Sequence, residues 1–155
     1  MTRTRRRPPR HAHDGFLMAL VLDTGPVLAL LDADDPFHAR SVEMIDAVDE
    51  RLVLVAPTLV EIDYWIRKRL TPDVWRALVD DIAAGAYHLE ELTATDLTRV
   101  GELERDYADL SLGMVDAAVI AVCERLGESK VATLDRRHFS VVRPRHCPVL
   151  ELLPD

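Results

Sequence analysis

Two short apolar runs in the sequence each end on an aspartate, and this feature constrains the fold more than any other. Leu20–Leu22 precede Asp23 in LVLD, and Val131–Leu134 precede Asp135 in VATLD. Short, apolar runs of this kind are typical of strands buried on both faces of a parallel sheet. An acid at the end of such a strand either caps the following helix or belongs to a site at the carboxyl edge of the sheet.

The rest of the chain alternates between strand-like and helix-like segments. Apolar runs predict strands over 19–23, 51–56, 86–92, 130–135 and 148–153. Helical periodicity, proline starts and glycine stops predict helices over 26–33, 36–50, 57–70, 71–85, 95–110 and 115–127. In the helix over 95–110, we expect Leu97, Val100, Leu103 and Tyr107 to face the core. This alternation predicts an α/β fold, with a parallel sheet covered by helices on both faces and the 86–92 strand near an edge.

The first 17 residues differ in composition from the rest. They hold five arginines, two prolines and a single acid, Asp14. We expect residues 1–17 to be either a disordered basic arm that contacts RNA phosphates or sequence upstream of a true start at Met18. Residues 18–155 are long enough for one domain with a sizeable core.

The net charge, the lengths of the apolar runs and the cysteines disfavour several classes of protein. A net charge of −8 disfavours a passive nucleic-acid coat, which would be basic. The sequence contains no run of 18 apolar residues, so it predicts no membrane span. Cys123 and Cys147 do not have zinc-ligand spacing or form a disulfide framework, and we expect a cytoplasmic protein.

Two further acids are expected at the same edge of the sheet as Asp23 and Asp135. Glu61 lies one turn into the helix after the second strand, and Asp116 lies in the first turn of the helix that begins near Met114. Each acid alone also has a purely structural explanation, such as a helix cap, a helix dipole or a turn. Four carboxylates on one edge repel one another, and oxygen ligands without a Cys or His set favour Mg²⁺ or Mn²⁺. Such a site is suited to phosphodiester hydrolysis.

Four segments of the sequence resemble the PIN-domain ribonucleases of the VapC toxin type. They are LVLDTGPVLALLD, VAPTLVEIDYWI, LGMVDAAVIAVCERLG and VATLDRRHFSVVRP. The resemblance covers nearly the whole chain after residue 17. It implies a three-layer α/β/α sandwich with a mostly parallel sheet, and cleavage of RNA dependent on Mg²⁺ or Mn²⁺. It also implies a VapB-type antitoxin as partner and a homodimer.

The resemblance assigns the site residues one by one. It gives Asp23, Glu61, Asp116 and Asp135 the four acidic positions, with Asp23 and Asp116 as direct metal ligands. Thr24 matches a small hydroxyl position beside the first acid, where it binds a ligating water or caps a helix. Two neighbours of the fourth acid, Arg136 and Arg137, either hold RNA phosphates or form a solvated turn. His138 contacts substrate or makes a structural hydrogen bond.

Two alternative functions stay open on the sequence alone. The acidic edge could receive an arginine from a partner protein, which would make the chain a binding module without catalysis. Another magnesium-dependent phosphoryl hydrolase is the second alternative. A phosphatase of the haloacid-dehalogenase type also ends its first strand on an aspartate, but it needs a second aspartate where this chain has Gly25. A receiver domain would need paired acids and a lysine in positions where neither occurs.

Overall fold

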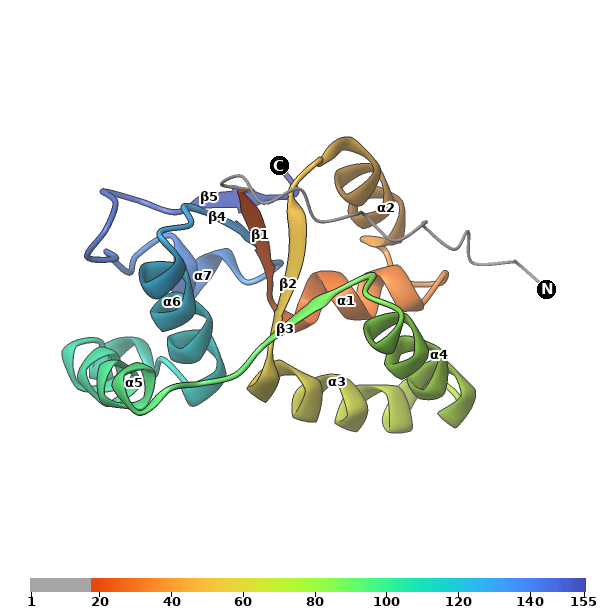
Figure 1. Cartoon of the computed structure of the whole chain (residues 1–155), viewed down its shortest axis with the longest axis horizontal. Coiled ribbons are helices and arrows are strands. Elements are labelled where there is room, and N and C mark those ends of the chain that lie inside the picture. Colours follow the sequence, from red (N-terminus) through yellow and green to blue (C-terminus); the bar gives the residue numbers. More distant parts are fainter. Residues whose placement is uncertain (1–17) are drawn as a thin grey trace.

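The computed structural model describes residues 18–155, which form a five-stranded sheet between two groups of helices (Figure 1). The strands are β1 (Ala19–Leu22), β2 (Arg51–Val55), β3 (His88–Glu90), β4 (Lys130–Ala132) and β5 (Glu151–Leu153). They lie in the order β3-β2-β1-β4-β5, and all four neighbouring pairs are parallel. The predicted α/β/α fold is therefore confirmed, with the 86–92 segment as an edge strand. The predicted basic tail lies outside the described residues.

The helices follow the strands in the alternating order that the sequence predicts. They are α1 (Thr24–Leu31), α2 (His38–Ala47), α3 (Ala56–Arg69), α4 (Pro72–Ala83), α5 (Ala94–Asp106), α6 (Met114–Leu126) and α7 (Arg136–Phe139), with a 3₁₀ turn, η1 (Ala108–Leu110). Helix α7 was not predicted, because one turn is too short to carry a helical period. Within residues 18–155, no helix is both long and apolar enough to cross a membrane.

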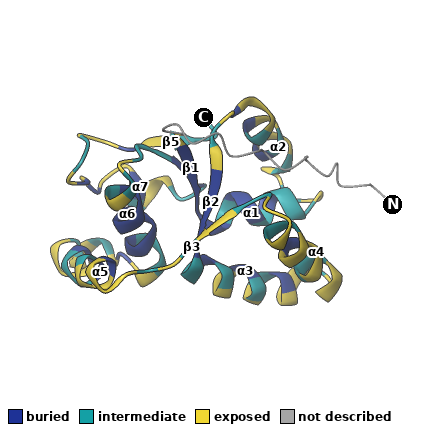
Figure 2. Ribbon diagram, viewed as in Figure 1, coloured by how far each residue is buried: buried dark blue, intermediate teal, exposed yellow. Residues whose placement is uncertain are grey.

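The sheet separates two hydrophobic cores, because successive side chains of a strand point to opposite faces. On β1, Val21 packs with α5 and α6, whereas Leu20 and Leu22 pack with α1, α2, α3 and α4. Helix α6 is buried along most of its length, which Figure 2 shows in dark blue. These two cores hold the strands rigidly, so that the residues directly after them have fixed positions.

One expectation about the core was wrong. Leu97 was expected to face inward, but it is 52% exposed. Thr93 and Asp96 form a reciprocal capping box at the start of α5, and Asp96 is also paired with Arg125 of α6. These contacts turn Asp96 and Val100 toward α6, which leaves Leu97 on the solvent side.

The strand order reverses direction between β1 and β4. Chain connections from β1 lead to β2 on one side, while β4 pairs on the other, so the crevice at their carboxyl ends is a topological switch point, where α/β proteins bind ligands. Gly25, in the first turn of α1, lies against Leu134, and a Cβ atom there would meet the Leu134 Cβ at 3.2 Å. A glycine at this position lets the segments after β1 and β4 approach closely.

Candidate active site

Asp23 directly follows β1 and is the most buried acid at the switch point. Its backbone is extended and it caps α1, with its Oδ1 accepting a hydrogen bond from the Thr24 amide at 2.7 Å. Its Oδ2 accepts a second hydrogen bond, at 2.8 Å, from the Thr133 hydroxyl. Only 6% of the residue is exposed. Asp23 can therefore both cap α1 and belong to a site, because the capping hydrogen bond holds its carboxylate in one orientation.

Glu61 reaches the same edge from α3. Its Oε2 accepts a hydrogen bond from the Thr24 hydroxyl at 2.8 Å, which ties the second turn of α3 to the first turn of α1. Glu61 itself is exposed, so the carboxylate is open to solvent while one oxygen is held in place. Thr24 was predicted to bind a ligating water or to cap a helix, and its hydroxyl here positions Glu61.

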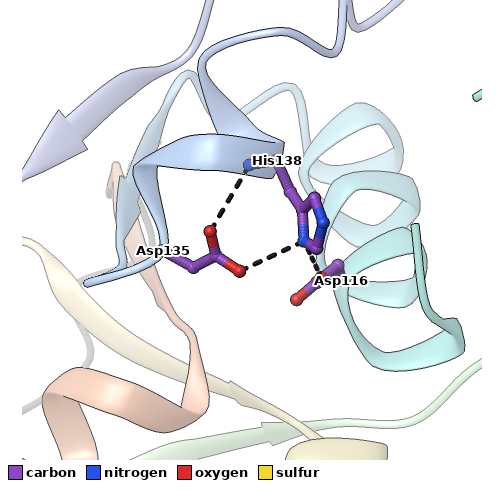
Figure 3. Close-up of side chains that lie close together, drawn as sticks. All are labelled: Asp116, Asp135 and His138. Carbon is purple, nitrogen blue, oxygen red and sulfur yellow. Dashed lines mark hydrogen bonds and ion pairs between the residues drawn. The ribbon is translucent and has the colours of Figure 1, made fainter. Parts of the chain in front are cut away.

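Asp116 and Asp135 meet at one imidazole ring (Figure 3). His138 Nδ1 lies 2.7 Å from Asp116 Oδ2 and 3.1 Å from Asp135 Oδ2. Asp135 also caps α7, with its Oδ1 accepting from the amides of Arg137 and His138. One ligand atom from each of the three side chains lies within 4.8 Å of the others, a spacing that would permit a shared metal ion.

Thr133 connects the two halves of the site, and sequence reasoning missed it. Its hydroxyl donates to Asp23 and accepts from the Asp135 amide at 3.0 Å. The residue is 1% exposed. The available signal was a hydroxyl residue in the otherwise apolar strand sequence VATLD, two positions before the acid.

The electrostatics of the site reflect burial and the crowding of like charges. Burial raises the pKa of Asp23 to about 6; the hydrogen bonds from Thr133 and Thr24 oppose this shift, and the charges of Asp116 and Glu61 add to it. Burial also raises the pKa of Asp116; His138 opposes the shift, while Asp135 and Glu61 add to it. Removing like charges from water costs free energy unless a cation compensates them. The four carboxylates thus form one electrostatic unit, drawn from four separate segments of the chain.

The two arginines beside Asp135 differ in their surroundings. Arg136 donates from its guanidinium to the Pro154 carbonyl at 2.5 Å, which ties α7 to the chain end after β5. Arg137 is exposed, and its guanidinium makes no hydrogen bond or ion pair within residues 18–155. Arg137 is therefore free to bind an anion next to the carboxylates, whereas Arg136 is occupied.

The donor set fits a hard divalent cation. Carboxylate oxygens are the preferred ligands of Mg²⁺ and Mn²⁺, and the raised pKa values mark a cluster that a cation would stabilise. The site lies at the mouth of the switch point, where Glu61 and Asp135 are open to solvent and Asp23 is not. An arrangement of this kind can hold a cation against the phosphate group of a substrate.

Comparisons with known proteins agree with this fold. The PIN-domain profile matches residues 20–143. Ribonuclease VapC26 of Mycobacterium tuberculosis is 34% identical over 125 residues, which cover 81% of this chain and 93% of that protein. The crystal structure of M. tuberculosis VapC20, described as a toxin that cleaves the sarcin–ricin loop, superposes with a TM-score of 0.68 at 19% identity. That match covers 72% of this chain and 86% of VapC20.

A second solved structure resembles the fold over a larger share of the chain. VapBC2 from Rickettsia felis, bound to a DNA fragment from its promoter, has a TM-score of 0.64 at 15% identity. The match covers 88% of this chain and 100% of the matched chain. At this level of identity, the solved structures support the fold alone.

Proposed function

The chain belongs to the PIN-domain family, and on that premise we propose that it is a ribonuclease that hydrolyses phosphodiester bonds in RNA as the toxin of a VapBC-type toxin–antitoxin pair. A curated relative that matches over nearly its whole length is named a ribonuclease, which supports the activity. The observation that carries the proposal is the convergence of Asp23, Glu61, Asp116 and Asp135 on one edge of the sheet.

We assign these four carboxylates to a site for Mg²⁺ or Mn²⁺. Asp23 and Asp116 are the direct ligands in this proposal, and Glu61 and Asp135 complete the site directly or through water. When bound, the ion would supply Lewis-acid stabilisation of phosphate charge and a more acidic water. The alternative of an acidic pocket without catalysis lacks support from the named relative, and it becomes one outcome of the test below.

The protein's own residues have separate tasks in this mechanism. Thr133 and the Thr24 amide hold the Asp23 carboxylate in one orientation and favour its charged form. The Thr24 hydroxyl holds one oxygen of Glu61, so the second oxygen can orient a water molecule for attack on the phosphorus. The proposal needs no protein nucleophile. Arg137 binds a neighbouring phosphate of the RNA and so positions the strand.

Solved structures of similar fold support the proposal of a partner protein. Structures that resemble this chain include toxin–antitoxin complexes from Klebsiella pneumoniae and R. felis, and we propose a VapB-type antitoxin for this protein. An antitoxin that offers a basic side chain to the acidic edge would block it. We further propose that the protein forms a homodimer and acts on RNA in the cytoplasm.

The experiment that tests the function is cleavage of a mixed pool of structured RNAs by the full chain, purified free of antitoxin. We expect defined cuts with Mg²⁺ or Mn²⁺ and none with EDTA. Asp116→Asn serves as the matched variant, because it keeps the size of the side chain and removes its charge. If the folded protein binds RNA but cuts none under any metal condition, the acidic edge is a binding pocket and the proposed activity is wrong.

A further inference from the structure

We propose that His138 is itself a ligand of the divalent ion, through Nδ1, together with Asp116 and Asp135, and that the site therefore binds Mn²⁺ in preference to Mg²⁺. This inference rests on the metal site of the proposed function and adds a nitrogen ligand to its carboxylates.

The hydrogen bond on the far side of the ring determines which nitrogen faces the acids. His138 Nε2 lies 3.1 Å from the Leu110 carbonyl oxygen of η1. A carbonyl oxygen only accepts, so Nε2 carries the hydrogen of this bond. Nδ1 then faces the two carboxylates, where it either donates a proton to Asp116 or offers its lone pair to a metal ion. Metal-bound histidines typically use this arrangement, with the second ring nitrogen donating to a backbone carbonyl.

Three electron-pair donors converge on one point in this cluster (Figure 3). His138 Nδ1 lies 2.7 Å from Asp116 Oδ2 and 3.1 Å from Asp135 Oδ2. Lone pairs at these distances repel unless a positive centre lies among them, either a proton on Nδ1 or a metal ion. The side chains of His138 and Asp116 are 16% and 19% exposed, so water screens this repulsion only in part.

The spacing suits a metal ion as well as a proton. Ligand atoms about 2.1 Å from an octahedral ion lie about 3 Å from their neighbours, close to the two distances of this cluster. Mixed nitrogen and oxygen ligands favour transition metals over Mg²⁺, which prefers oxygen and retains water. Mn²⁺ accepts the carboxylates as Mg²⁺ does and also accepts the imidazole, so His138 sets the choice between the two ions.

Two glutamine variants separate a ligand role from a structural one. In His138→Gln, the side-chain amide can still donate to the Leu110 carbonyl, but no nitrogen lone pair faces the carboxylates. His146→Gln is the matched control, because His146 Nε2 also contacts a backbone carbonyl, that of Glu128 at 2.9 Å, away from the acids. Thermal unfolding of the full-length variants checks that both are folded.

The test is Mn²⁺ binding followed by electron paramagnetic resonance, with pulsed measurements to detect nitrogen bound directly to the ion. We expect nitrogen coupling in the wild type and in His146→Gln, and its loss in His138→Gln. We also expect Mn²⁺ affinity to fall at least about tenfold in His138→Gln, while Mg²⁺ affinity, measured by competition, stays within about twofold.

Different results would overturn the role of His138 and the metal site itself. Tight Mn²⁺ binding with oxygen ligands alone, or tighter binding by His138→Gln, would overturn this inference while leaving the carboxylate site in place. The second result would mean that the protonated ring competes with the ion. A wild-type protein that binds neither ion and cleaves RNA without metal would overturn both this inference and the metal site of the proposed function.

Discussion

Thr133 links Asp23 to Asp135 through one buried hydroxyl. The hydroxyl donates to Asp23 Oδ2 at 2.8 Å and accepts from the Asp135 amide at 3.0 Å, so it connects the segments that follow β1 and β4. This hydrogen bond also lowers the pKa of Asp23, against the larger effect of burial. Thr133 thus keeps the deepest carboxylate of the site both oriented and charged.

Replacing Thr133 by valine tests this relationship. Thr133→Val keeps the shape of the side chain, but Asp23 Oδ2 loses its donor, so the Asp23 pKa should rise further. We expect the acidic limb of the pH–rate profile for RNA cleavage to move to higher pH, and unfolding in urea to show a loss of about 1–3 kcal/mol. Thr133→Ser should behave as the wild type; an unchanged pH profile in the valine variant would contradict the role.

Asp23 makes the stability of the metal-free protein depend on pH. Its pKa is raised from 3.8 to about 6, so the folded protein holds this proton more tightly than the unfolded chain does. Its contribution to stability is fully present below pH 3.8 and is lost as the pH rises through about 6, an effect of about 3 kcal/mol.

The measurement is urea unfolding in EDTA between pH 4 and pH 8. Asp23→Asn removes the titration, so the wild type should lose stability relative to this variant as the pH rises. Saturating Mn²⁺ should restore the stability of the wild type at pH 8. Parallel stability curves for the two proteins across this range would show that Asp23 titrates normally.

Thr24 is expected to act through Glu61. Thr24→Val removes the hydroxyl that holds Glu61 Oε2, and we expect cleavage to fall about tenfold, with little change in unfolding free energy. Thr24→Ser keeps the hydroxyl and should restore the rate. Equal losses in both variants would indicate that packing around the methyl group, rather than the hydrogen bond, is what matters.

Arg137 is expected to bind substrate and not to take part in the chemical step. Its guanidinium is free within residues 18–155, while that of Arg136 is bound to Pro154. Arg137→Gln should raise KM several-fold at low salt, leave kcat unchanged and weaken the salt dependence of KM. Arg136→Gln is the control and should affect mainly the stability of the α7 region. A fall in kcat alone for Arg137→Gln would assign it to the transition state.

The strand ends of the site were predictable because parallel strands place their carboxyl ends on one edge of the sheet. Asp23 and Asp135 follow apolar runs, and Asp116 begins a strongly periodic helix, so their common edge followed from local sequence. The position of Glu61 at this edge could be predicted from its distance to the start of α3. The resemblance to a known family then supplied the roles.

The contacts between these residues could not be read from the sequence. Thr133 directly follows β4 in an apolar stretch of sequence, and nothing local indicates that its hydroxyl joins two acids from different segments. His138 meets Asp116 only because α7 begins directly after Asp135 and brings the imidazole to the first turn of α6. Leu97 was misplaced because ion pairing between α5 and α6, rather than apolar periodicity, sets the rotation of α5.

The most direct test of a catalytic metal held by these carboxylates is single-turnover cleavage of an RNA that the protein cuts, measured during Mn²⁺ titration of protein stripped with EDTA. We expect the wild-type rate to return as Mn²⁺ is added. In Asp116→Asn, we expect it to stay at least about a hundredfold lower at every concentration, because several kcal/mol of charge stabilisation are lost. Full cleavage by the stripped wild type, or a normal rate in Asp116→Asn, would contradict the metal site.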